Sequence, residues 1–456
     1  MLADQLSATA LPAYGNRVVK APRLARLGDE GIVFERALCA SPLCVPSRAA
    51  LMTGLLPSQT GAIDNAGELP AGFPTFAHRL RLLGYRTVLA GKMHFIGPDQ
   101  LHGFEERPMT DVYPAGFDWI PDWDLADDER LPWYHNLSSV LRAGPVRSTL
   151  QLEYDAEAVE CALAALEAPD PRPLLLVVSF THPHDPYEVP AEYWERYDAV
   201  EIDAPAGPEP ADDPVTRRLR TMAGSAPVSV EQTLAARRGY YGAISLVDDH
   251  LGTILDALRE DTIVVFTSDH GDMLGERGLW YKMAPFEPSI RVPLIVHGLG
   301  AHRVAEPVSL LDLAPTLVAL GGGSMEGVDL LSAEPPPRDL PIEYLAEGVR
   351  SPQVTLVRGP LKLIRSLGEP DLVYDLDADP HERAPADPGS LTEAVAARWD
   401  LDRLDREVRA SQRRRRIVAQ ALATGRATTW DHPAGRGRYI NTGDDFWSTL
   451  ERARRA

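Results

Sequence analysis

Apolar positions along the chain follow two patterns that alternate. Residues 22–31 and 75–84 have apolar side chains at helical spacing and end in glycine, and a short apolar run follows each window, so each predicts a helix and then a strand. The runs at 172–180 and 261–268 are continuously apolar, which is typical of strands buried on both faces of a parallel sheet. Between them, residues 230–258 predict a long helix. This alternation predicts a doubly wound α/β sheet, which binds ligands beyond the carboxyl ends of its strands.

The pattern changes after the proline-rich stretch "SAEPPPRDLP". The segments "QVTLVRGPLKLIRS" and "DLVYDLDADPHE" predict hairpin strands. We therefore expect an α/β catalytic domain over residues 1–332, a small antiparallel β subdomain over 333–395, and a helix with an extended tail over 396–456 that serves oligomerisation. The basic run Arg413–Arg416 is interpreted as a solvated helix face or a subunit contact.

Composition and charge limit the partners. The 456 residues carry a formal net charge of −20, which disfavours binding to nucleic acid or to an anionic membrane. Three cysteines cannot form a disulfide framework and do not have zinc-site spacing. No basic-then-apolar leader pattern opens the sequence and no window resembles a membrane span, so we expect a cytoplasmic protein with neither a nucleic-acid nor a membrane partner.

Polar residues follow several of the predicted strands, where an open α/β sheet places its site. They are Asp4 and Gln5, Lys92 and His94, His182 and His184, and Asp269 and His270. Two strand-end carboxylates could hold a hard divalent cation. Lysine and histidine side chains could surround a tetrahedral anion. Taken singly, each residue could equally cap a helix or satisfy a loop.

A lone cysteine stands in "SPLCVPSRAALMTG". Pro46 is expected near the first position of a helix, so that the free N–H groups of the helix N-terminus face Cys44. Such surroundings could lower the thiol pKa and produce a reactive thiolate. The alternative is a buried, inert cysteine before a helix.

The segment Cys44–Arg48, extended to "SRAALMTGLLPSQTG", resembles the signature of type I sulfatases of the alkaline-phosphatase superfamily. "GKMH", the Asp269-His270 pair and Lys282 strengthen this resemblance. "GKMHFIGPDQLHGFEER", "WYHNLSSV", "THPHDPY" and "SDHGDMLGERGLWYKM" further resemble choline sulfatases. The resemblance implies an alkaline-phosphatase-like mixed sheet flanked by helices. It also implies that a formylglycine-generating or equivalent maturation enzyme oxidises Cys44 to Cα-formylglycine.

The resemblance assigns roles to individual residues. A divalent metal, Ca²⁺ with Mg²⁺ or Mn²⁺ as alternatives, is held by Asp4, Gln5, Cys44, Asp269 and His270. One hydroxyl of the hydrated aldehyde attacks sulfur, and proton loss from the other releases sulfate. The remaining catalytic residues are Arg48, Lys92, His94, His184 with His182 as its alternate, and Lys282. His184 is the preferred general acid or contact of the leaving oxygen.

The implied substrate is choline O-sulfate, and the resemblance also places its binding residues. These are Asn65 for the sulfate, Trp119, His135 and Glu347 for the quaternary ammonium, and Asp444 or Asp445 from the tail of a neighbouring subunit. The tail contact implies a homo-oligomer, a dimer or a tetramer. An arylsulfatase or a phosphonate monoester or phosphodiester hydrolase on the same scaffold is the competing activity. If Cys44 stays unmodified, the protein could instead be an inactive binder of quaternary amines or anions.

Overall fold

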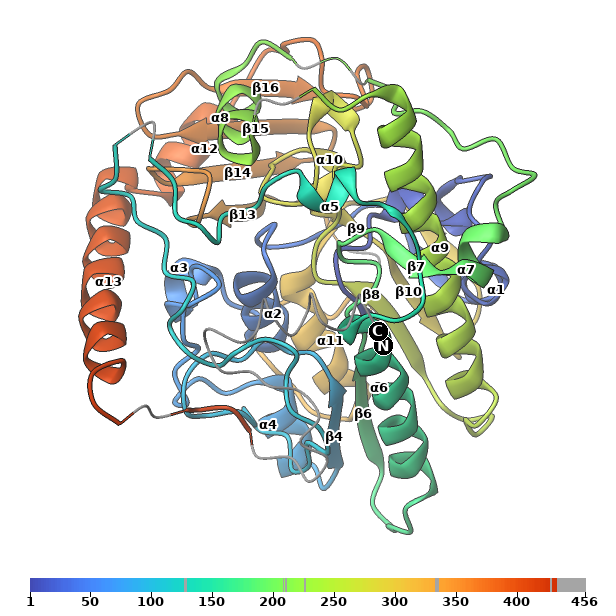
Figure 1. The fold of residues 1–456 in the computed structure, drawn as a ribbon. Helices are drawn as coiled ribbons and strands as arrows, with labels where there is room; N and C mark the ends of the chain where they lie inside the picture. The colour runs from blue at the N-terminus through green and yellow to red at the C-terminus, as the bar shows by residue number, and fades with distance from the viewer. Residues whose placement is uncertain are drawn as a thin grey trace.

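The computed structural model describes residues 1–126, 129–207, 209, 211–224, 227–332, 336–426 and 429–432. Its centre is a seven-stranded sheet (Figure 1). In spatial order the strands are β11 (His302–Val304), β2 (Ile32–Phe34), β10 (Leu294–His297), β8 (Val264–Ser268), β1 (Leu2–Ala3), β6 (Leu174–Ser179) and β4 (Arg86–Gly91). Strands β8, β1, β6 and β4 run parallel, whereas β10 runs antiparallel to its neighbours β8 and β2. The predicted mixed α/β sheet is confirmed.

Helices cover both faces of this sheet. Successive strand residues enter different apolar clusters: Ala3 and Ile295 belong to one, while Leu2 and Leu294 belong to the other. This is the period-2 alternation of a sheet with two buried faces. The first cluster includes α1 (Pro22–Glu30), α6 (Leu150–Glu167) and α9 (Val230–Leu255); the second includes α2 (Cys44–Thr53), α4 (Phe76–Leu82) and α11 (Leu313–Leu320). The helices predicted over 22–31, 75–84 and 230–258 are thus confirmed.

One sheet prediction is wrong in part. Strand β6 is buried only at its last two residues, and Leu174–Val177 are half-buried. Strand β1 has two residues and pairs with β6 through Leu2 and Ser179, so the first half of β6 has no β1 neighbour on that side. A cavity of about 590 Å³, lined among others by Leu175, Val177 and Val265, lies along this part of β6.

A second sheet follows in the chain. It is antiparallel and contains β13 (Leu340–Tyr344), β14 (Gln353–Arg358), β15 (Leu361–Ser366) and β16 (Leu372–Asp375). The predicted hairpin strands are therefore confirmed. Helix α12 (Leu391–Arg398) packs on this sheet through Leu391 and Val395. Helix α13 (Leu401–Leu422), red in Figure 1, then runs along the edge of the molecule beside the segment that contains α3.

Short elements complete the fold. They are β3 (Ala37–Leu38), β9 (Arg291–Val292) and β12 (Val308–Ser309) in a three-stranded sheet, the pair β5 (Gly144–Val146) and β7 (Glu188–Pro190), and helices α3 (Pro57–Thr60), α5 (Ser138–Leu141), α7 (Ala191–Glu195), α8 (Pro214–Ala223) and α10 (Glu287–Ile290). Within the part of the chain that the structure describes, no helix is long and apolar enough to cross a membrane.

Candidate active site

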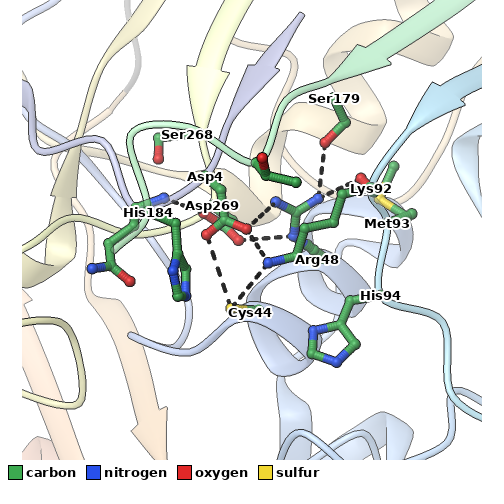
Figure 2. A network of polar contacts seen from close by, with 12 residues as sticks. Asp4, Cys44, Arg48, Lys92, Met93, His94, Ser179, His184, Ser268 and Asp269 are labelled. Atoms are coloured by element: carbon green, nitrogen blue, oxygen red, sulfur yellow. Dashed lines mark hydrogen bonds and ion pairs between the residues drawn. The ribbon is translucent and has the colours of Figure 1, made fainter. Parts of the chain in front are cut away.

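The carboxyl ends of four parallel strands meet at one edge of the central sheet. Asp4 follows β1, Lys92 follows β4, the loop with His184 follows β6, and Asp269 follows β8. Figure 2 shows these side chains directed toward one another and toward Cys44. The prediction that the strand ends gather there is confirmed, because parallel neighbours end on the same side of a sheet.

Cys44 is the first residue of α2, with Leu43 as N-cap. The helix thus begins two residues earlier than expected, and Pro46 occupies its third position. Proline is tolerated there because the N–H groups of the first turn have no partner within the helix. The first helical bond runs from Ser47 N–H to the Leu43 carbonyl, and Val45 N–H donates instead to Asn65 Oδ1 at 3.1 Å. Asn65 therefore caps the turn that carries Cys44.

The Cys44 side chain lies at the centre of the polar cluster. Its Sγ is 3.3 Å from His270 Nε2, 3.8 Å from Lys92 Nζ and 4.0 Å from Asp4 Oδ1. Burial, reinforced by Asp4 and opposed by Lys92, raises the pKa of the thiol to about 12. Without a bound cation, these surroundings therefore favour the neutral thiol over the reactive thiolate.

Arg48, one turn after Cys44 on α2, links two strand ends. Its Nε donates to Asp269 Oδ2 at 2.8 Å and its Nη2 to Asp4 Oδ2 at 3.2 Å. Its Nη1 donates to the Lys92 carbonyl at 2.7 Å and to Ser179 Oγ at 3.0 Å. The side chain is 1% exposed, so this planar fork of donors offsets the charge of two buried carboxylates. Lys92 Nζ is a second cationic partner of Asp4, so Arg48 and Lys92 together balance the two carboxylates.

Asp4, Cys44, Asp269 and His270 place their ligand atoms within 4.8 Å of one another, and all four are buried. Burial alone would raise the pKa of Asp4, but Lys92 and the other nearby cationic groups lower it well below its usual range, so the group is a carboxylate. Burial lowers the pKa of His270 to about 4 and leaves its imidazole neutral. Two carboxylates and a neutral imidazole are a donor set that suits a divalent cation. The residues present therefore fit the expected metal.

Gln5 has other contacts in this structure. Its Nε2 donates to Asp272 Oδ2 at 2.7 Å, and its Oε1 accepts from Lys282 Nζ at 2.8 Å. Its φ of 62° lies in the left-handed region, which is sparsely populated for residues with a side chain. The amide thus lies beside the cluster and is held in place by two buried partners.

His94 is buried to 2% exposure and lines the cavity beside Cys44. Among the described residues, neither of its ring nitrogens has a hydrogen-bond partner. Its φ of 58° is held because the Met93 and His94 N–H groups both donate to Asp111 Oδ2, at 2.9 and 2.7 Å. Burial, followed by Lys92, lowers the pKa of His94 well below its usual range. The ring is therefore neutral and lies on the cavity wall with neither nitrogen hydrogen-bonded among the described residues.

A cavity of about 490 Å³ opens from Cys44 and holds the other predicted binding residues. Its lining includes Asn65, Trp119, His135, Glu347 and Tyr113. The Trp119 ring stands 5.1 Å from the Tyr113 ring, edge to face. His135 Nδ1 lies 2.7 Å from Glu347 Oε1, and Glu347 is 1% exposed. The structure thus brings Asn65, Trp119, His135 and Glu347 together; Asp444 and Asp445 lie outside the described residues.

The sulfatase family model matches residues 1–323 of this chain, and a model described as choline sulfatase enzyme C terminal matches residues 406–455. The chain belongs to the sulfatase family. This sulfatase is 41% identical to the choline-sulfatase of Rhizobium meliloti (strain 1021), and the alignment covers 95% of this chain and 92% of that protein. It is 29% identical to the uncharacterized sulfatase YidJ of Escherichia coli (strain K12), over 84% of this chain and 81% of that protein.

Solved structures share the fold of the sulfatase. The phosphonate monoester hydrolase SpPMH from Silicibacter pomeroyi superposes with a TM-score of 0.67 at 21% identity, covering 91% of this chain and 94% of that chain. A likeness at that identity shows a common fold and leaves the substrate open.

Two histidines of the sulfatase follow β6, and the structure separates them. Burial and Lys282 lower the pKa of His184 to about 3, so the ring is neutral. His184 Nδ1 lies 2.7 Å from the Asp185 carbonyl, and Lys282 Nζ lies 2.5 Å from His184 Nε2. His182 bonds to Asp155 Oδ2 at 2.6 Å and is not among the described residues that line the cavity. His184 therefore faces the site beside Lys282, whereas His182 points away from the cavity.

Sequence reasoning missed Tyr113, Asp111 and Asp64. The centroid of the Tyr113 ring lies 4.3 Å from Lys92 Nζ and 4.7 Å from the centroid of the His94 ring. Asp111 holds the His94 backbone, as described above. None of the three belongs to a motif; the loop that contains Asp111, Tyr113 and Trp119 has no periodic pattern that would indicate which of its side chains turn inward.

Proposed function

We propose that this sulfatase hydrolyses choline O-sulfate to choline and sulfate. The wall of the cavity beside Cys44 carries this proposal. A quaternary ammonium cannot donate a hydrogen bond and is bound instead by aromatic faces and negative charge. The Trp119 and Tyr113 rings and the buried Glu347, paired with His135, supply both. The 41% identical relative that is named choline-sulfatase supports the same substrate.

Position 44 is proposed to carry Cα-formylglycine, formed from Cys44 by a maturation enzyme. The hydrated aldehyde supplies one hydroxyl as the nucleophile toward sulfur, and proton loss from its second hydroxyl lets sulfate leave. A sulfate ester of cysteine or serine has no such internal route. His94, whose ring nitrogens are unpartnered among the described residues, is the proposed acceptor of that second proton.

Asp4, Asp269, His270 and the side chain at position 44 are proposed to hold a divalent cation, Ca²⁺ with Mg²⁺ or Mn²⁺ as alternatives, with Gln5 adjoining. The bound cation supplies positive charge that favours ionisation of the nucleophilic hydroxyl. Arg48 holds the two carboxylates in register. All of the side chains given these roles are buried.

Two ammonium groups are proposed to contact the transferring sulfuryl oxygens. Lys92 Nζ lies 3.8 Å from Cys44 Sγ, and Lys282 is buried on the cavity wall. Positive charge that is already in place stabilises the charge that develops there without reorganisation. We assign the proton for the leaving choline oxygen to Lys282, which the neutral His184 holds in position.

A substrate panel tests the proposal. We expect kcat/KM for choline sulfate to exceed that for 4-nitrophenyl sulfate and for an aryl phosphonate monoester. A preference for the phosphonate would favour the competing activity of the same fold, and a preference for the aryl sulfate would favour an arylsulfatase. The mass of the tryptic peptide around residue 44 decides between enzyme and binder, because only an aldehyde-bearing peptide accords with turnover.

A further inference from the structure

Helix α13 places one face against two loops of the substrate cavity. The side chains on this face are Arg409, Gln412 and Arg415, spaced three residues apart and therefore on neighbouring turns. Arg409 Nη1 donates to the Trp123 carbonyl at 2.8 Å, and Gln412 Oε1 accepts from Trp123 N–H at 3.2 Å. Trp123 belongs to the same loop as Trp119. The interpretation of the arginine run as wholly solvated or intersubunit is therefore wrong for Arg415, which is 9% exposed.

Arg415 binds the second loop, which contains Asp64 and Asn65. Its Nη1 and Nη2 donate to the two oxygens of Asp64 at 2.7 and 2.6 Å, a bidentate pair. Asp64 is fully buried, and its Oδ1 also accepts from Ala66 N–H at 2.9 Å. The position of this carboxylate thus sets the turn that contains the next residue, Asn65.

Asn65 connects the Asp64 turn to the helix end that carries the nucleophile. Its Oδ1 accepts a hydrogen bond at 3.1 Å from Val45 N–H, a first-turn group that has no partner within α2. Because Cys44 precedes Val45, a shift of the Asn65 turn changes the support of the helix end that presents residue 44. Arg415 reaches residue 44 through Asp64, Asn65 and the backbone of Val45, although 371 positions separate Arg415 and Cys44 in the chain.

We propose that Arg415 is a positioning residue for the nucleophile, acting through Asp64 and Asn65. The inference rests on the proposed sulfatase chemistry at position 44. A displacement of a reacting group by about 1 Å can cost about 100-fold in rate. Loss of the pair should therefore lower kcat more than it raises KM, because Arg415 does not touch the ammonium wall.

The test replaces Arg415 by Met and uses Arg414→Met, an exposed neighbour on the same helix, as matched control. Both kcat and KM are measured with choline sulfate and 4-nitrophenyl sulfate, and kcat is divided by the fraction of residue 44 that carries the aldehyde. We expect Arg415→Met to lower kcat about 10- to 100-fold for both esters, with KM within about threefold. Arg414→Met should match the wild type, and Arg415→Lys should recover part of kcat.

A double variant guards against loss of the fold. Asp64→Asn with Arg415→Met removes both charges, so no buried carboxylate is left alone. We expect the kcat of the double variant to equal that of Asp64→Asn alone, because both substitutions break the same Arg415–Asp64 pair. A corrected kcat at the wild-type level in either Arg415→Met or the double variant would overturn the proposal. If the wild-type enzyme cleaved only the aryl ester, the proposed substrate would be overturned instead. The ratio of kcat for the aryl ester between Arg415→Met and the wild type would still test the role of Arg415.

Discussion

Replacement of Trp119 by alanine tests the ammonium wall directly. The half-buried indole lies 5.1 Å from the Tyr113 ring and 5.6 Å from the His94 ring, on the cavity that opens from Cys44. Its removal deletes apolar contact area, which any bulky substrate would lose. It also deletes a cation–π attraction that only a substrate with a cationic group would lose. For an ammonium that is desolvated against the ring, this second part is about 2 kcal/mol, or about 30-fold in affinity.

The assay separates the two parts by pairing choline sulfate with 3,3-dimethylbutyl sulfate, which has the same shape but an uncharged tert-butyl group in place of the trimethylammonium. The apolar loss lowers kcat/KM for both esters, so it cancels in their ratio. We expect Trp119→Ala to lower the ratio of kcat/KM for choline sulfate to kcat/KM for the dimethylbutyl ester about 10- to 30-fold. Trp119→Phe, which keeps a smaller aromatic face, should give an intermediate ratio.

An unchanged ratio would refute the reasoning, because the indole would then contribute shape alone. A melting temperature for each variant, close to that of the wild type, shows that the fold has survived. Glu347→Gln provides an independent check: it removes charge without changing shape and should lower the same ratio.

Three further predictions concern position 44, the metal and a buried histidine. Cys44→Ala should abolish sulfate release, as should Cys44→Ser in a host that does not oxidise serine; near-normal turnover by either would contradict the nucleophile assignment. Chelation should lower both activity and melting temperature, and Ca²⁺ at 100 times its Kd should restore about 2.7 kcal/mol of stability, whereas a melting temperature indifferent to Ca²⁺, Mg²⁺ and Mn²⁺ would contradict the metal site. Burial lowers the pKa of His102 from 6.5 to about 4, so the unfolded chain takes up the proton first and stability falls as pH drops below 6.5. Between pH 7 and pH 5, urea unfolding should show that His102→Gln loses about 2 kcal/mol less free energy of unfolding than the wild type does. Equal losses in the two proteins would contradict this prediction.

The fold and the strand-end residues could be predicted because their signals are local. Continuous apolar runs mark the strands, and the polar residues that follow them come to one edge because the strands are parallel. Asp4, Lys92 and Asp269 were found in this way. The motif around Cys44 and Arg48 added the rest of the cluster, since its residues lie within one helical turn of each other.

The choice between His182 and His184 shows the limit of local reasoning. Both follow the same strand and both are buried. Asp155 on α6 engages His182, whereas Lys282, far along the chain, engages His184. No spacing within "THPHDPY" encodes which partner each ring meets. Only the packing of α6 against the sheet decides it.

By itself the sequence determined the order of strands and helices, the strand-end carboxylates and the turn that carries Cys44, because hydrophobic periodicity and short motifs act over a few residues. Tertiary structure alone decided that Asp111 holds His94, that Glu347 meets His135, and that Arg415 meets Asp64, 351 residues away. Each of these contacts depends on which surfaces pack together and exclude water. A charged side chain is buried only where that packing supplies its partner, and a linear pattern does not contain this information.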